Sequence, residues 1–234
     1  MKKQSFILFL ILILIIPSCS NKKNIPLAKN YSEQSKFEAE QDNIRQALQL
    51  VDKSIELENK PESLAYKVTL LYQLQDFKQC CELCKKIIND KKTPVTLKAD
   101  TLNNYACSLL ALGKEDKAQE IWQELTENKN YLSPEVAWLN LGRLELLNAI
   151  RNKDQDVLFN EFIVKANKSL SKSVELSSEY VDASYYLAIT YIYLNNLEKA
   201  KNILEDILLF VPDHKAVQSL LSQVKIKIQE PVEK

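Results

Sequence analysis

The sequence predicts an all-α protein built from repeated helical hairpins, and three observations lead to this prediction. Only two of the 234 residues are glycine, whereas strand hairpins and phosphate-binding loops need glycine where the backbone takes a positive φ. Apolar residues recur three and four positions apart along most of the chain, which is the spacing of amphipathic helices. In three stretches, a small residue on one expected helix is followed at the same fixed interval by another on the next helix.

Residues 1–18 are predicted to be a signal peptide. Lys2 and Lys3 precede an unbroken run of eleven apolar residues, from Phe6 to Ile16. A transmembrane helix needs about 20 such residues, so a short apolar run behind two positive charges indicates a secretory signal.

The end of this segment, Ile16-Pro17-Ser18-Cys19, resembles a bacterial lipobox, in which an aliphatic residue and two small residues precede a cysteine. The resemblance implies cleavage before Cys19 and acylation of Cys19, so that several acyl chains hold the protein on a membrane. Pro17 departs from the pattern, because Ala or Ser is usual there, and a chance cysteine behind an ordinary signal peptide is the alternative. Ser20 stands where Asp usually marks retention in the inner membrane, which favours the outer membrane, facing the periplasm.

Residues 19–35 are predicted to be a flexible tether, because they are polar and show no helical periodicity. Residues 36–230 then form the folded part. The chain carries 31 Lys and Arg against 31 Asp and Glu, a balance without the basic stripe that nucleic-acid binding requires. We therefore expect no nucleic-acid partner, and membrane attachment only through the N-terminal lipid.

The folded part is expected to begin with one amphipathic helix between Phe37 and Leu57. Its apolar face includes Ala47 and Val51, and Ser54 follows at the same spacing. In the hairpins described below, small residues with this spacing lie on the second helix. The stretch is therefore predicted to be an N-terminal half-repeat whose first helix is short or lost.

Four helical hairpins are expected to follow, over residues of about 61–94, 99–132, 135–180 and 181–214, with a capping helix over 215–229. The fixed interval joins Val68 to Cys80, Ala106 to Ala118, and Ala188 to Ala200, twelve positions in each case. Small residues are required there because two helix axes approach closely. The capping helix has one apolar face and several lysines elsewhere, which suits the solvated end of a repeat array.

The third hairpin departs from this register, since the interval from Gly142 to Ala166 is twice as long. The additional residues lie around Asn148 to Phe162 and include several apolar side chains. We therefore predict a lengthened helical hairpin that projects from the other repeats, and not a disordered loop.

The last hairpin resembles a tetratricopeptide repeat, whose first helix carries a Trp, Leu-Gly, Tyr series and whose second carries an Ala, Phe, Pro series. The stretch from Val181 to His214 contains Leu187, Ala188, Tyr191, Ala200, Leu204 and Pro212 at the matching positions. The run AWLNLG, from Ala137 to Gly142, is similar to the core of the same signature. The resemblance implies a right-handed α-solenoid of about four repeats, with the N-terminal half-repeat and the C-terminal cap. With the lipobox, it suggests a tetratricopeptide repeat lipoprotein of a bacterial cell envelope.

Four cysteines follow the expected lipid site, namely Cys80, Cys81, Cys84 and Cys107. Cys80 and Cys84 occupy positions that packing residues hold in the next hairpin, and a buried cysteine behaves as a small hydrophobe. Core packing is therefore the favoured interpretation. A disulfide, with Cys81 and Cys107 as the least strained pair, and a metal site are the alternatives, although no histidine nearby completes the usual zinc spacing.

The sequence contains no motif that indicates an enzyme. His214 is the only histidine, and it follows Pro212-Asp213 in an expected loop without an orienting partner. The nucleotide-binding, serine-hydrolase and metalloprotease motifs do not occur. We predict a protein that is not an enzyme and uses no cofactor or metal.

The candidate binding residues lie on the first helices of the hairpins. The tetratricopeptide resemblance implies that first-helix side chains not used for packing line a concave face and bind partner segments. Ten positions are assigned to that face: Tyr66, Tyr72, Asn103, Asn104, Asn140, Arg143, Tyr185, Tyr186, Ile189 and Tyr193. Tyr and Arg are common interface anchors. The alternative is that the tyrosines only cover neighbouring helices.

These expectations predict a membrane-anchored scaffold that binds a peptide or helix of other envelope proteins in its concave groove. The family's clamp for a terminal carboxylate is not reproduced, because Ala65 and Thr69 stand at its positions. A second hypothesis is a small-ligand-binding component of a periplasmic transport system, with an apolar pocket near Tyr185 and Tyr193. A third is a redox or metal protein that uses the cysteines.

Overall fold

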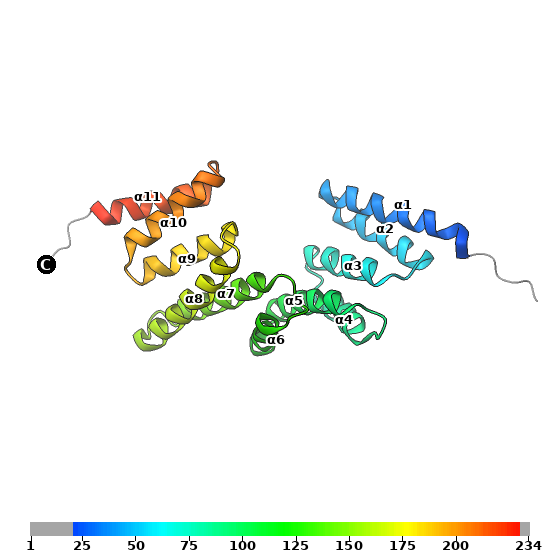
Figure 1. Cartoon of the computed structure of the whole chain (residues 1–234), viewed down its shortest axis with the longest axis horizontal. Helices are drawn as coiled ribbons and strands as arrows, with labels where there is room; N and C mark the ends of the chain where they lie inside the picture. Colours follow the sequence, from blue (N-terminus) through cyan, green and yellow to red (C-terminus); the bar gives the residue numbers. More distant parts are fainter. Residues whose placement is uncertain (1–20, 230–234) are drawn as a thin grey trace, which may run out of the picture.

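The computed structural model describes residues 21–229, with side chains from residue 24 onward, and this part of the chain holds eleven helices and no strand (Figure 1). The helices are α1 (Asn21–Glu40), α2 (Ile44–Leu57), α3 (Pro61–Gln73), α4 (Phe77–Asn89), α5 (Val95–Ala111), α6 (Glu115–Glu127), α7 (Pro134–Arg151), α8 (Asp156–Leu176), α9 (Val181–Tyr193), α10 (Leu197–Phe210) and α11 (Lys215–Gln229). The predicted signal peptide and Cys19 lie outside the described residues.

The helices form an α-solenoid, as predicted. Each helix packs mainly on its neighbours in sequence, so that α1–α2, α3–α4, α5–α6, α7–α8 and α9–α10 are five consecutive hairpins and α11 covers the last. First helices of successive hairpins also contact one another, α3 with α5 and α7 with α9. The hairpins follow a curved path, with α1–α2 and α10–α11 at opposite ends (Figure 1).

The N-terminal end differs from the prediction. Most of the segment assigned to a flexible tether belongs to α1, which pairs with α2, so the expected half-repeat is a complete hairpin. Ala28 and Ser35 of α1 are buried, and the Ser35 hydroxyl donates to the carbonyl of Ala47 at 2.6 Å. The Ser54 hydroxyl donates in return to the carbonyl of Ala28 at 2.8 Å. The helix is held by small residues and hydroxyl groups, which leave no apolar periodicity in the sequence.

Four of the five hairpins have the same tight turn. Asp42, Gln75, Gly113 and Asn195 have φ values of 63°, 59°, 74° and 55° at the end of the first helix. The N–H group of the next residue then bonds a carbonyl five positions back, as from Asp76 to Leu71 at 2.9 Å. This is a Schellman ending, which satisfies carbonyls that a helix end otherwise leaves without a partner.

The third hairpin lacks this turn and is longer. Its second helix, α8, has 21 residues, whereas α2, α4, α6 and α10 have 13 or 14. The added part does not stand free, because Phe159 makes an edge-to-face contact with Tyr193 of α9, with ring centroids 5.5 Å apart. Ile163 and Ala149 are also fully buried there. The third hairpin is thus a lengthened helical hairpin and not a disordered loop, and one side of its extension packs on the next repeat.

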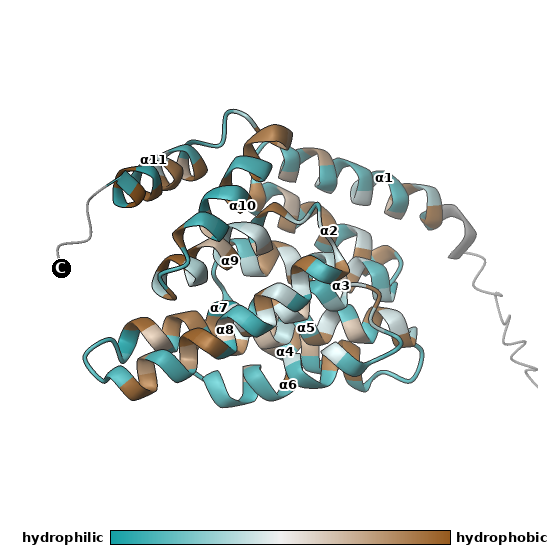
Figure 2. Cartoon of the chain, turned by 60° about the vertical axis from the view of Figure 1, so that its left-hand side comes forward, coloured by the Kyte–Doolittle hydropathy of each residue, from teal (hydrophilic) through white to brown (hydrophobic). Residues whose placement is uncertain are grey.

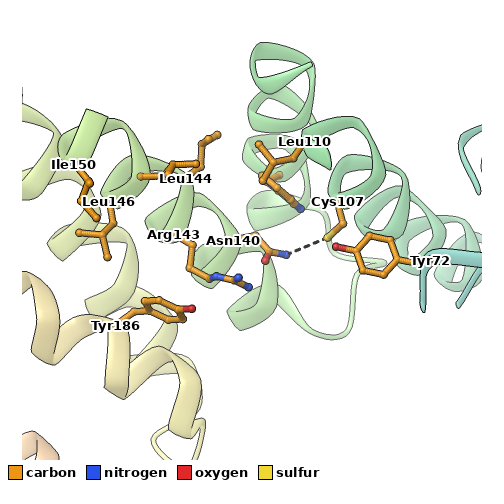
Figure 3. Close-up of a pocket in the computed structure, with 11 residues that line it drawn as sticks. Tyr72, Cys107, Leu110, Asn140, Arg143, Leu144, Leu146, Ile150 and Tyr186 are labelled. Carbon is orange, nitrogen blue, oxygen red and sulfur yellow. Dashed lines mark hydrogen bonds between the residues drawn. The ribbon is translucent and has the colours of Figure 1, made fainter. Parts of the chain in front are cut away.

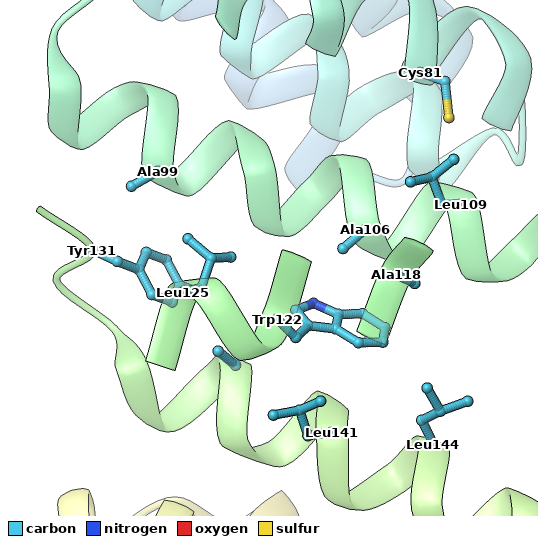
Figure 4. Packing of buried hydrophobic residues seen from close by; sticks show 11 residues of the cluster. Cys81, Ala99, Ala106, Leu109, Ala118, Trp122, Leu125, Tyr131, Leu141 and Leu144 are labelled. Atoms are coloured by element: carbon cyan, nitrogen blue, oxygen red, sulfur yellow. The ribbon is translucent and has the colours of Figure 1, made fainter. Parts of the chain in front are cut away.

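The core is a row of apolar clusters between the helices, and Figure 4 shows the one around Trp122. Ala106 and Ala118, one of the small-residue pairs found in the sequence, are fully buried where α5 meets α6. Trp122 is only 1% exposed and fills the space between α5, α6 and α7. Small residues therefore set the close helix approach, and one large residue fills the gap beside it.

The four cysteines of the described residues are free thiols in the packed region. Cys80, Cys81 and Cys84 are buried, and Cys107 is half-buried. The Ser108 hydroxyl donates to the sulfur of Cys80 at 2.9 Å. The hydrogen bond with Cys80 and burial raise the pKa of the Cys84 thiol. No group of three possible metal ligands occurs in the described part of the chain.

Candidate functional site

The first helices of four hairpins form one side of a groove of about 310 Å³. Tyr72 comes from α3, Cys107 and Leu110 from α5, Tyr186 from α9, and Trp122 of α6 lies at its base. Helix α7 supplies the remaining six residues: Asn140, Arg143, Leu144, Leu146, Leu147 and Ile150. Figure 3 shows most of these side chains converging from α3, α5, α7 and α9.

The groove has a buried base and an exposed rim. Trp122 and Leu144 are 1% and 2% exposed, and they pack in the core beneath it. Tyr72, Leu147 and Ile150 are 40%, 36% and 44% exposed. Large apolar side chains therefore reach solvent at both ends of the groove, and exposed apolar surface of this kind is typical of binding sites. The opening makes this a groove and not an enclosed cavity.

Arg143 is the only charged side chain in the lining. Its guanidinium lies over the ring of Tyr186, with 5.1 Å between the guanidinium carbon and the ring centroid. No carboxylate lines the groove, and Arg143 forms no ion pair within residues 24–229. A guanidinium has five N–H donors in a planar fork that fits a carboxylate. The groove therefore combines apolar surface with one guanidinium whose N–H donors are available to a carboxylate.

A hydrogen-bond network holds Asn140 in place. Its side-chain amide donates to Oδ1 of Asn103 at 3.0 Å and to the sulfur of Cys107 at 3.8 Å. Asn103 Oδ1 also accepts the indole N–H of Trp122 at 3.0 Å. The Asn103 oxygen thus accepts two hydrogen bonds, one from Asn140 and one from Trp122. Asn103 does not line the groove, but it positions Asn140, which does. The Oδ1 atom of Asn140 accepts no hydrogen bond from side chains of the described residues.

Burial raises the pKa values of two groups that line the groove, Cys107 and Tyr72. It raises the pKa of the Cys107 thiol to about 11, although the charge of Arg143 acts in the opposite direction. Burial also raises the pKa of Tyr72. A thiol with so high a pKa is a poor nucleophile, because the thiolate is the reactive form. The groove offers binding contacts, and its thiol is not activated for chemistry.

The ten residues predicted for the concave face divide into two groups. Tyr72, Asn140, Arg143 and Tyr186 line the groove, and Asn103 supports Asn140 from below. Asn104 lies beside Asn103 on α5 and is half-buried. The remaining four pack between helices or at the ends of the array: Tyr66, Tyr185, Ile189 and Tyr193.

Four of the predicted residues contact other parts of the chain instead of lining the groove. The Tyr66 hydroxyl donates to the carbonyl of Ser35 at 3.4 Å and so fastens α1. The Tyr185 ring stacks on His214 with the ring centroids 6.2 Å apart. Ile189 joins the cluster between α8 and α9, where the lengthened hairpin meets its neighbour. The repeat pattern does not predict these contacts with α1, with α8 and with the loop before α11.

Seven groove residues are not among these ten positions: Cys107, Leu110, Trp122, Leu144, Leu146, Leu147 and Ile150. Four of them lie on α7, and Leu146 and Ile150 are four positions apart on one face of that helix. The available signal was the apolar periodicity of α7, which continues farther past Gly142 than the other first helices continue past their small residues. Within the described residues, no helix has the length and apolar character needed to cross a membrane.

Comparison with known proteins supports the fold. Residues 163–224 match a family model described as a tetratricopeptide repeat. TTC0263, a thermophilic tetratricopeptide repeat protein of Thermus thermophilus, superposes with a TM-score of 0.61 at 13% identity, over 85% of this chain and 99% of that chain. The pilF protein of Pseudomonas aeruginosa gives 0.63 at 13% identity, over 89% and 92%. YrrB, described as a tetratricopeptide repeat protein with an unusual peptide-binding site, gives 0.50 at 18% identity, over 86% and 97%.

No curated protein matches the sequence. The structural likenesses establish the tetratricopeptide solenoid as the fold, although few residues are identical. Proteins with such repeats generally mediate protein–protein interactions, and they are typically scaffolds without catalytic activity.

Proposed function

We propose that this chain is a non-catalytic adaptor that docks a segment of a partner protein in the groove along α3, α5, α7 and α9. The segment, a peptide or a helix, places apolar side chains on the exposed rim formed by Tyr72, Leu147 and Ile150. One of its carboxylates meets Arg143. Burial of aromatic and aliphatic rim residues supplies most of the binding free energy, as at other interfaces with central aromatic anchors.

The observation that carries this proposal is the environment of Arg143. Its guanidinium is held over Tyr186 in an apolar groove that contains no carboxylate. Covering this surface with a purely apolar partner would desolvate the cation without compensation, which is unfavourable. A partner with an Asp or Glu between apolar residues restores the lost hydrogen bonds. Asn140, whose amide donors are already used by Asn103 and Cys107, leaves its oxygen for a backbone N–H of the segment.

We further propose that Cys19 carries lipid and holds the adaptor on the envelope membrane, facing the periplasm if the outer membrane is its site. The support is the residue pattern around Cys19, with Lys2, Lys3 and the apolar run before it. Labelling of cells with an alkyne analogue of palmitate tests this directly. The natural chain should incorporate label, and a Cys19→Ala variant should lose it and leave the membrane fraction. Equal labelling of the two chains would contradict the proposal.

The small-ligand hypothesis has less support. It requires an enclosed apolar pocket near Tyr185 and Tyr193, but Tyr185 stacks on His214 and Tyr193 packs against Phe159. The groove described above opens to solvent elsewhere, between α3 and α9. An open groove of this kind suits a protein segment better than a small apolar molecule, which is usually buried over most of its surface.

Photo-crosslinking in cells tests the docking proposal. A photoreactive amino acid placed at Leu147, on the rim, should crosslink one dominant envelope protein, while the same group at Leu132, which is 75% exposed outside the groove, should not. The Arg143→Gln and Tyr186→Ala variants should each reduce the Leu147 crosslink by about tenfold, the usual effect of losing an interface anchor. The helical circular dichroism signal should not change. Equal crosslinking from Leu147 and Leu132, or no effect of either variant, would refute the groove as the docking site.

A further inference from the structure

A second apolar pocket lies away from the groove, where the end of α8, the start of α9 and the last turns of α10 meet. Its volume is about 510 Å³, larger than that of the groove. Val174 of α8, Val181 of α9 and Ile203 of α10 form apolar walls, and Leu209 and Phe210 stand at the end of α10. None of its residues lines the groove, so the two sites are separate. We call it the α8–α10 pocket.

The apolar edge of this pocket is unusually exposed. Leu209 and Phe210 are 78% and 71% exposed, and Leu176 at the end of α8 is 46% exposed. The last turn of α10 is accordingly one of the brown segments in Figure 2. Ile207, one turn before Phe210, also lines the pocket but is buried in the core. Leu209 and Phe210, by contrast, leave most of their surface uncovered by this chain.

The charges around the pocket have one sign. Glu179 and Asp206 belong to its lining, and no Lys, Arg or His among the described residues does. Neither carboxylate forms an ion pair within residues 24–229, whereas nearby Lys172 and Lys201 are already paired with Glu175 and Glu198. Two helices, α8 and α10, end beside the pocket and favour a positive charge there, whereas α9 begins at Val181 in its lining and favours a negative one. The pocket therefore has the opposite polarity to the groove, where the lone charge is Arg143.

We propose that the α8–α10 pocket is a second docking surface, and that its occupant is a basic amphipathic segment of a partner protein. The apolar residues of that segment cover Leu209 and Phe210 and enter the pocket, and a Lys or Arg pairs with Glu179 and Asp206. Covering the two carboxylates with a neutral partner would remove their hydration without compensation. An anionic membrane surface is disfavoured for the same reason, since like charges would face each other.

The test uses two synthetic helical peptides with identical leucine positions, one with lysines and one with glutamates on the polar face. Binding to the full lipidated chain in zwitterionic nanodiscs is measured by fluorescence anisotropy, with empty nanodiscs subtracted. The lysine peptide should bind at least about tenfold more tightly than the glutamate peptide. Leu209→Ser/Phe210→Ser should weaken lysine-peptide binding about tenfold, as should Glu179→Gln/Asp206→Asn.

Matched controls separate this site from others. Val157→Ser removes an apolar side chain that is 81% exposed on the third hairpin, and Glu124→Gln/Glu127→Gln removes two carboxylates of α6 that lie outside the pocket. Both should leave the affinity unchanged, and so should Arg143→Gln in the groove. No binding of the lysine peptide, equal binding of both peptides, or an equal effect of the controls would overturn the proposal. So would a concentration-dependent dimer in sedimentation that Phe210→Ser abolishes, since the occupant would then be a second copy of this chain.

Discussion

The third hairpin differs from the other four in where its first helix ends and in how the two helices are joined. In the regular hairpins, a residue with positive φ ends the first helix seven positions after the small residue, as Gly113 does after Ala106. In the third hairpin the corresponding position is Ala149, which is still inside α7 and is fully buried. The helix continues to Arg151, which pairs with Glu115 at the start of α6. The extension is therefore fastened on both sides, to α6 and to α9.

This difference shows where the binding surface comes from. Three of the regular hairpins contribute between one and three side chains each to the groove, and α7 alone contributes six. Regular first helices end five positions after their small residue, so among the six residues from α7 only Ile150 lies in the added part. The irregular repeat thus adds an apolar side chain to a groove that the regular part of α7 already lines. The predictions below test whether the irregular hairpin is as tightly built as the regular ones.

The largest effect is expected at Trp122, which joins a regular hairpin to α7. Replacement by Ala should lower the free energy of unfolding by about 3–5 kcal/mol, the usual cost of removing a large buried aromatic side chain. It also removes the indole donor to Asn103. Urea unfolding followed by circular dichroism measures the change. A loss below about 1 kcal/mol would mean that α5, α6 and α7 are not packed through this residue.

A smaller loss is expected from Gly142→Ala, which tests the close approach of α7 to α8. A Cβ atom at this glycine would lie 2.5 Å from Cγ and 3.2 Å from the backbone nitrogen of Leu170. Overpacking of this kind typically costs about 1–3 kcal/mol, which exceeds the gain of about 1 kcal/mol in helix propensity. A double variant with Leu170→Ala, which removes the side-chain clash, should lose less than the sum of the two single changes. Strict additivity in urea unfolding would show that the two residues do not press on each other.

A substitution in the turn of a regular hairpin is expected to increase stability, by an amount similar to or smaller than the loss from Gly142→Ala. Gln75→Gly should stabilise the chain by about 0.5–1 kcal/mol, because a non-glycine residue at positive φ is strained and glycine is not. The greater freedom of glycine in the unfolded chain offsets part of this gain. Gly113→Ala is the mirror test and should destabilise, although no atom lies within 4 Å of the added Cβ. Thermal unfolding of both variants measures the effect. The same sign of change in both would contradict a backbone origin.

The smallest effect concerns Glu145 of α7, which faces Ser169 of α8. Burial raises the pKa of this carboxyl in the folded protein above the usual value of 4.5, although the hydrogen bond from Ser169 acts in the opposite direction. At a pH below the pKa of Glu145 in the unfolded chain, the carboxyl is protonated in both states and costs no stability. As the pH rises through the raised pKa of the folded protein, the free energy of unfolding decreases. Glu145→Gln should raise the melting temperature slightly at pH about 7 and leave it unchanged at pH about 4. Glu124→Gln, outside the core, is the control and should show no such pH dependence.

Much of the fold was predictable because it is local. The fixed interval between small residues depends only on the helical period and on a tight turn, so it appears in the sequence as residue types at set positions. It extends to the first hairpin as well, where Ser35 and Ala47 have the same separation as Ala106 and Ala118. That pair was missed because Ser35 is polar and its neighbours show no apolar periodicity. Its hydroxyl instead bonds a carbonyl of α2, and this bond depends on the tertiary structure.

The candidate site was only half predictable. Tyr72, Asn140, Arg143 and Tyr186 were assigned to the binding face from their positions on first helices. The same rule selected Tyr66 and Tyr185, which pack against α1 and His214. The position of a residue on a helix predicts the direction of its side chain. It does not predict whether a neighbouring hairpin or a terminal helix covers that side chain.

The sequence by itself determined the helical class, the register of the hairpins and the location of the irregular repeat, because each of these depends on spacing within about 34 residues. Only the tertiary structure decided which side chains converge on the groove, that Arg143 lies over Tyr186, and that Leu209 and Phe210 stand beside two carboxylates. The reason is that these arrangements depend on the angles between successive hairpins. Small differences in packing at each interface accumulate along a solenoid, so residues from distant repeats meet in a way that no local pattern specifies.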